Sequence, residues 1–387
     1  MYSNYCFCTI HFSKVRESAG LHIRKIRTGI IFSLVLAFVV MTGVALYADI
    51  PQMFSALARF HWAYLPLILV LTLFNYLCRF FKWQYFLKRL TLHVPWVKSL
   101  LIFLSGLSMA ITPGKIGELL KSYMLKNTNG APISRTSPII VAERLSDGLA
   151  MLVLAATGLV LYHFSWAILL ILLAVGLGGI TLIQNRTLSL AVLSFGERLP
   201  LVARFAHLVR DFYESSYTLL QWRPLLLAVC IGVISWSGEC VALYFVFLGL
   251  GITAGPDLLL KSIFILSVSS LIGSASGLPG GLGTADGSML GLTRLLVTTS
   301  ATIGGAATLL IRLCTLWFGL GVGVIALLLF RLTQHTGIPS RQEDTREQKH
   351  LPGLEHETLS TLPVYEREIS FQPAPATASA RDGDNTI

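Results

Sequence analysis

The chain has 387 residues, of which 54% are hydrophobic and 13% charged, and its formal net charge is +10. Soluble domains carry roughly 25% charged residues, so this composition leaves too few polar side chains to cover a soluble surface. We therefore predict an all-α polytopic membrane protein. Membrane proteins concentrate Lys and Arg in cytoplasmic loops, so we assign the basic excess to that rule and expect no nucleic-acid partner.

A helix needs about 20 apolar residues to cross a bilayer. About six such runs follow one another along the chain, at residues 29–48, 63–86, 138–161, 165–183, 224–248 and 301–330. The basic segment 1–28 and the arginine-rich polar segment 185–223 should both face the cytoplasm. The acidic tail 334–387 has no sustained apolar periodicity, and we expect it to be disordered and cytoplasmic. The sequence thus predicts one transmembrane domain, residues 29–333, with both termini in the cytoplasm.

Two further apolar elements contain a Pro-Gly break. The first runs over 98–111, breaks at Pro113-Gly114 and continues as an amphipathic stretch to Lys126, and each piece is too short for a straight crossing. The second covers 258–298 and breaks within 278–283. Non-helical backbone at membrane depth occurs only where it is buried in protein or faces water. We therefore predict two re-entrant hairpins with the functional site between their breaks.

The two broken elements share spaced motifs. The matched residues are Lys98 with Lys261 at an offset of 163, Gly114 with Gly280 at 166, and Arg144 with Arg312 at 168. Counting crossings gives the halves, about 63–161 and 224–331, opposite orientations. Transporters with inverted repeats have this arrangement, and their broken helices meet around the substrate. The alternative is that Pro-Gly kinks recur by chance in a large apolar chain.

Three charged residues, Glu143, Arg144 and Asp147, lie inside a predicted span. A charge at the centre of a membrane helix costs roughly 2.5–3.5 kcal/mol on insertion scales, so such residues usually face an interior cavity. Glu143 and Asp147 share a helix face, and Arg144 can reach Asp147 three residues later. Two interpretations stay open: a structural ion pair that fixes packing, or a functional group that forms a polar wall for a charged head group or a gating latch.

The first break predicts an anion site. A helix that begins after Pro113-Gly114 presents free backbone N–H groups and the positive end of its dipole, which Lys115 would reinforce. Gly117 completes the Pro-Gly-x-apolar-Gly motif, and Glu118 would temper the positive charge or couple to a proton. The alternative is that Lys115 extends to the membrane interface.

The second break contains the glycines that a tight turn or a close backbone approach requires. Its candidate site residues are Pro279, Gly280, Gly281, Gly283 and Asp286. Arg312 lies inside the last predicted span and needs a carboxylate partner, for which Glu239 is the clearest candidate. For Arg312, structural pairing and substrate contact both stay open. We expect Arg79 and Lys82, which lie near the end of the second span, at the membrane interface.

Three segments, TPGKIGELLK at 112–121, ERLSD at 143–147 and PGGLG at 279–283, resemble the lysylphosphatidylglycerol synthase transmembrane-region family of flippase-like proteins. The resemblance covers about residues 25–332. It implies an integral protein of the bacterial or archaeal cytoplasmic membrane that translocates a lipid or lipid-linked molecule, and the basic site predicts an anionic head group. Asp286 departs from the family pattern, which usually has Glu after the second break.

Some members of this family carry a soluble aminoacyl-transferase domain, and the short tail leads us to expect none here. Nucleotide-binding, zinc-protease and nucleophile-elbow motifs do not occur in the sequence, so we expect neither enzymatic activity nor a bound cofactor or metal. Two alternatives stay open. One is a non-transporting partner that recruits a lipid-biosynthesis enzyme through 185–223 or the tail. The other is a membrane enzyme with Glu143 and Asp147 as acid–base groups.

Overall fold

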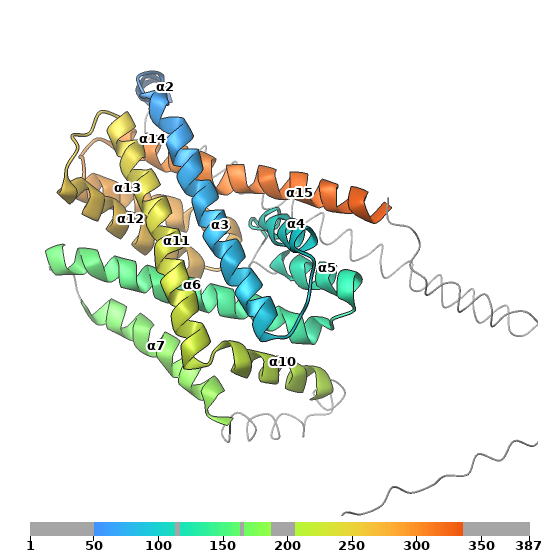
Figure 1. Cartoon of the computed structure of the whole chain (residues 1–387). Helices are drawn as coiled ribbons and strands as arrows, with labels where there is room; N and C mark the ends of the chain where they lie inside the picture. The colour runs from blue at the N-terminus through green and yellow to red at the C-terminus, as the bar shows by residue number, and fades with distance from the viewer. Residues whose placement is uncertain (1–49, 113–116, 163–165, 187–205, 336–387) are drawn as a thin grey trace, which may run out of the picture. The chain divides into compact units, whose positions relative to one another are not determined.

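The computed structural model describes residues 50–112, 117–162, 166–186 and 206–335 (Figure 1). The chain divides into the units Met1–Thr336 and Gly337–Ile387, and every described residue belongs to the first. All regular secondary structure in the described ranges is helical. The predicted basic segment 1–28, the predicted span 29–48 and all but two residues of the predicted tail lie outside these ranges.

Five helices form the first half of the described chain. They are α2 (Ile50–Ala58), α3 (Leu65–Arg89), α4 (Trp96–Leu107), α5 (Leu119–Asn129) and α6 (Ile133–Tyr162), with the short η1 (Trp62–Tyr64) before α3. α4 packs against α5, so the two pieces of the first broken element lie side by side. α7 (Trp166–Gln184) and α10 (Ala206–Leu219) connect this half to the next, and both pack against α6.

The second half begins with α11 (Trp222–Gly249), which lies beside α3 along much of its length (Figure 1). The second broken element follows as α12 (Pro256–Ala275), the short η3 (Pro279–Gly281) and α13 (Thr284–Leu296). The last predicted span is α14 (Ala301–Arg312) and α15 (Phe318–His335), joined by the π-helical turn η4 (Leu313–Trp317). Such turns frequently occur at functional sites, and this one follows Arg312 directly.

Two helix starts differ from the expectations. Residues 50–58, which lie between the first two predicted spans, form α2. The span predicted at 138–161 begins earlier, because α6 starts at Ile133 and contains Pro138. Gly130, with φ of 74°, ends α5, and the carbonyl of Pro132 then accepts hydrogen bonds from the N–H groups of Arg135 and Thr136. These bonds close the first turn of α6 before Pro138 is reached.

Among the described residues, four helical stretches are long and apolar enough to cross a membrane: Trp62–Arg89, Trp222–Gly249, Pro256–Ala275 and Ala301–Thr333. The expectation of about six spans therefore stays a prediction, as does the re-entry of the two hairpins. The two broken elements also differ in length, because α12 has 20 residues and α4 has 12.

Two apolar cores hold the described helices together. One lies between α3, α11, α12 and α14 and contains Ile68, Phe247 and Ile265. The other lies between α3, α4, α5, α6 and α10 and contains Trp83, whose indole N–H donates to Ser99 Oγ at 3.1 Å. Close van der Waals packing in these cores fixes the helices that carry the polar residues between them.

Candidate functional site

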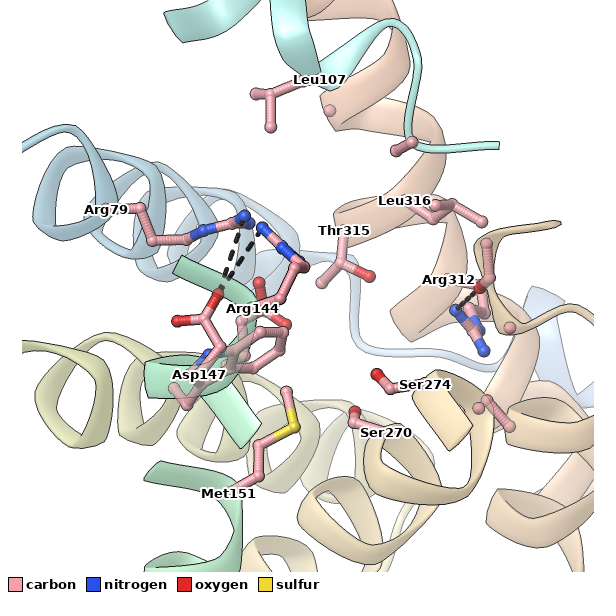
Figure 2. A pocket seen from close by; sticks show the side chains of 18 of the residues that line it. Arg79, Leu107, Arg144, Asp147, Met151, Ser270, Ser274, Arg312, Thr315 and Leu316 are labelled. Carbon is pink, nitrogen blue, oxygen red and sulfur yellow. Dashed lines mark hydrogen bonds and ion pairs between the residues drawn. The ribbon is translucent and has the colours of Figure 1, made fainter. Parts of the chain in front are cut away.

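A cavity of about 460 Å³ lies between helices of the two halves. The charged residues that line it are Arg79 of α3, Glu118 and Lys121 at the start of α5, Arg144 and Asp147 of α6, Glu239 of α11 and Arg312 of α14. In Figure 2, Arg79 and Arg144 point toward Asp147, and Arg312 lies across the cavity with Thr315 between. The second break also reaches the cavity, through Gly280 and Gly281.

Asp147 accepts ion pairs from three cations. The Lys82 ammonium contacts its Oδ1, while Arg144 Nη2 lies 3.6 Å and Arg79 Nη2 lies 4.0 Å from Oδ2. The predicted pairing of Arg144 with Asp147 is thus confirmed. The expectation that Arg79 and Lys82 lie at the membrane interface is wrong: Lys82 is 1% exposed and Arg79 lines the cavity. The buried carboxylate of Asp147 gives both cations an interior partner, so neither has to extend to water.

Two further ion pairs lie beside Asp147 in the first half. Arg144 Nε lies 3.4 Å from Glu118 Oε2, and Lys121 Nζ lies 2.5 Å from Glu143 Oε2. Lys121 also lies 4.8 Å above the Trp83 ring, a distance typical of a cation–π contact. Lys121 is buried, because the face of α5 that carries it packs against α6.

In the second half, Arg312 pairs with Asp286. Its Nε lies 2.5 Å from Asp286 Oδ1, and its Nη1 donates to the carbonyl oxygen of Gly280 at 3.3 Å. Asp286 also accepts from the backbone N–H of Gly283 at 2.9 Å and so caps α13. The suggestion that Glu239 is the partner of Arg312 is therefore wrong, because Asp286 is brought to Arg312 by the turn at the second break.

The predicted site residues separate into three groups. Pro113, Gly114 and Lys115 lie outside the described residues. The predicted residues that line the cavity are Glu118, Arg144, Asp147, Gly280, Gly281 and Arg312. Those that support the lining residues are Gly117, Glu143, Pro279, Gly283 and Asp286. Gly117 does so by donating its backbone N–H to Thr112 Oγ1 at 2.9 Å across the first break.

Eight pairs of cavity-lining residues recur in the two halves at nearly the same offset. Phe103, Gly106, Leu107 and Ala110, on α4 and just after it, correspond to Ser270, Gly273, Ser274 and Gly277, on α12 and just after it, each 167 residues later. Arg144, Asp147, Gly148 and Met151 of α6 correspond to Arg312, Thr315, Leu316 and Gly319 of the last span, each 168 residues later. The ion pair of Glu118 with Arg144 likewise recurs, 168 residues later, as that of Asp286 with Arg312.

Sequence reasoning missed several lining residues, among them Tyr76, Lys121, Trp236, Ser270 and Ser274. The two serines lie 167 residues after Phe103 and Leu107, which the sequence reasoning also missed. Within the described ranges, no group of three or more His, Cys, Asp or Glu side chains could hold a metal ion.

The helices and the polar cavity define a polytopic α-helical membrane protein. The family model described as "Lysylphosphatidylglycerol synthase TM region" matches residues 30–323, and the chain belongs to this family. The resemblance of its three motifs to that family is therefore confirmed.

Curated relatives occur in archaea. Two relatives from Methanothermobacter thermautotrophicus are both named "UPF0104 membrane protein". One is 29% identical over 29% of this chain and 32% of the relative, and the other is 26% identical over 54% of this chain and 68% of the relative. The "UPF0104 membrane protein MJ1078" of Methanocaldococcus jannaschii is 23% identical over 48% of this chain and 78% of the relative. In the first of these alignments the chain spans about a third of the relative's length.

Proposed function

We propose that this protein moves a lipid or lipid-linked molecule between the leaflets of the cytoplasmic membrane, with an anionic head group bound in the cavity. The observation that carries the proposal is the presence of three guanidinium groups, those of Arg79, Arg144 and Arg312, around one cavity between apolar helices. Arginine binds phosphate and carboxylate oxygens with paired hydrogen bonds, and its charge does not depend on pH.

Arg144 has hydrogen-bonding capacity to spare. Its Nε and Nη2 are buried and make no hydrogen bond, although both lie within 4 Å of a carboxylate oxygen. A buried donor without an acceptor lowers stability. A hydrogen bond from such a donor to a ligand oxygen therefore contributes more binding free energy than the same bond would in water. The side chains of Ser270 and Ser274 border the same space and add hydroxyl donors (Figure 2).

The matching spacing of the lining residues supports an inverted repeat. If the halves have opposite orientations, the two broken elements enter from opposite faces and the head group binds where they meet. The cavity then lies near the middle of the membrane. In this arrangement both termini lie in the cytoplasm, and small movements of one half against the other open the cavity to either leaflet.

Recruitment of a partner enzyme stays a prediction. It was expected through residues 185–223 or the tail, and residues 187–205 and 336–387 lie outside the described ranges. In the described part of that segment, α10 packs on α6.

Reconstitution tests the proposal. Vesicles of phosphatidylcholine would carry acyl-labelled phosphatidylglycerol, and bleaching of the outer leaflet would report the exchange rate. We expect the wild type to exceed protein-free vesicles, and Arg144→Gln to lose about tenfold or more, since a charge-assisted hydrogen bond contributes about 1.5–3 kcal/mol. The matched control is Arg186→Gln, because Arg186 lies outside the cavity in an exposed pair with Glu214. Equal rates for wild type and empty vesicles would refute the proposal.

A further inference from the structure

Glu239 differs from the other carboxylates at the cavity. Glu118, Glu143, Asp147 and Asp286 each have a cation within 4.0 Å. Glu239 is 7% exposed and lines the same cavity, yet no hydrogen bond or ion pair joins its carboxylate to another described residue. An ionised carboxylate without a partner is costly away from water, so protonation is an available response at this position.

The surroundings of Glu239 contain few charges. The charged side chains that act on it are Arg79 of α3, Asp147 of α6 and Arg312 of α14, and the phenol of Tyr76 on α3 is also near. On the other packed elements, α12 carries only Asp257 and Lys261 as charged residues, and these pair with each other at 2.6 Å. From η1 the only titratable side chain is that of Tyr64. Among the described residues, the charged groups that act on Glu239 are therefore those that line the cavity.

The described charges around the cavity are equal in number when Glu239 is ionised. With the partners of the lining residues included, the described cations are Arg79, Lys82, Lys121, Arg144 and Arg312. The described carboxylates are Glu118, Glu143, Asp147, Glu239 and Asp286. Five positive and five negative charges balance when Glu239 is ionised. When Glu239 binds a proton, one positive charge is left over, which an anion of single charge, such as a phosphodiester, would neutralise.

We infer that Glu239 is a proton-binding site that couples the uptake of one proton to the binding of one anionic head group. The inference rests on the proposed lipid translocation. Counted over the described residues, two states of the cavity are neutral: empty with Glu239 ionised, and loaded with both a proton and a phosphodiester. A net charge is costly at membrane depth. The cavity therefore switches most readily from one leaflet to the other in these two neutral states. Transport is then an electroneutral symport of lipid and proton.

A pH gradient across vesicles tests the coupling. The probe is acyl-labelled phosphatidylglycerol in phosphatidylcholine vesicles with an acidic exterior and an alkaline lumen. We expect the wild type to enrich the probe in the inner leaflet by up to about tenfold per pH unit, because one proton moves with each lipid. A potassium diffusion potential without a pH gradient should produce no enrichment.

Three variants make the result specific. Glu239→Gln is the neutral isostere and should show no enrichment and no dependence of its exchange rate on pH. Glu239→Asp should retain the pH-driven enrichment. Glu214→Gln, at an exposed position of α10, is the matched control and should behave as the wild type does. Thermal unfolding of each variant identifies any that fails to fold.

The outcomes separate the inference from the proposed function. If the wild type exchanges lipid faster than protein-free vesicles but a pH gradient drives no enrichment, the proton coupling is wrong and the translocation stands. Enrichment by Glu239→Gln as strong as that of the wild type would also refute the role of Glu239. If the wild type exchanges no lipid, the proposed function and the inference are both wrong.

Discussion

Asn75 of α3 and Ser235 of α11 exchange hydrogen bonds. Asn75 Nδ2 donates to the carbonyl oxygen of Ser235 at 3.0 Å, and Ser235 Oγ donates to the carbonyl oxygen of Asn75 at 3.1 Å. Such reciprocal contact is the mark of a two-fold relation between two elements. The residues that follow at equal spacing, Tyr76 with Arg79 and Trp236 with Glu239, all line the cavity. α3 and α11 therefore occupy equivalent places, although one presents a cation where the other presents a carboxylate.

This exchange should contribute measurably to stability. Asn75→Ala and Ser235→Ala should each lower the free energy of unfolding by about 0.5–1.5 kcal/mol, the usual net contribution of a hydrogen bond. Each single variant leaves the other hydrogen bond in place, because each bond joins the side chain of one residue to the backbone carbonyl of the other. Thermal unfolding in detergent measures the losses. Thr181→Ala is the control, since the Thr181 hydroxyl bonds only to Gly178 of its own exposed helix turn.

Removing one charge of the Lys121–Glu143 pair should lower the stability of the protein much more than removing both charges. Glu143→Gln leaves the Lys121 ammonium buried without a counter-charge, at a cost of about 3–5 kcal/mol. The double change Lys121→Met with Glu143→Leu removes both charges and should cost less than half as much. Denaturant or thermal unfolding of the solubilised protein compares the two.

An exposed pair provides the scale for this comparison. Arg186 and Glu214 are 60% and 45% exposed at their side chains, so Arg186→Gln should cost at most about 1 kcal/mol. A loss for Glu143→Gln that is no larger would show that Lys121 reaches water in the folded protein.

How much of this site can be predicted from the sequence depends on how far apart in the sequence the contacting residues lie. Residues close in sequence were placed correctly: α11 was expected at 224–248 and lies at Trp222–Gly249, and Arg144 reaches Asp147 within one helix turn. The partner of Lys82 was not foreseen. Its ion pair with Asp147 joins residues 65 positions apart, and a basic residue near a helix end can equally extend to the interface. The π-helical turn η4 was also missed, because an apolar run contains no signal for one extra residue in a turn.

Gly281 should tolerate alanine less well than Gly277. Both have positive φ, 67° and 66°, so an added Cβ strains both backbones by about 1–2 kcal/mol. At Gly281 that Cβ would also lie 3.1 Å from Gly273 Cα, whereas at Gly277 nothing lies within 4 Å. Gly281→Ala should therefore lower the melting temperature further and reduce lipid exchange more. Equal effects of the two variants would mean that the contact between α12 and the second break is loose.

The turns that follow the two hairpins should lie on opposite sides of the membrane if the halves are inverted. Asn129, at the end of α5, and Thr299, between α13 and α14, are both exposed and occupy corresponding places. In a chain whose native cysteines are replaced, Asn129→Cys and Thr299→Cys would each be treated with an impermeant maleimide in sealed cells and in inverted vesicles. We expect Asn129→Cys to react from the cytoplasmic face and Thr299→Cys from the opposite face. Reaction of both from one face would exclude the inverted repeat, because the chain between the two positions would then cross the membrane an even number of times.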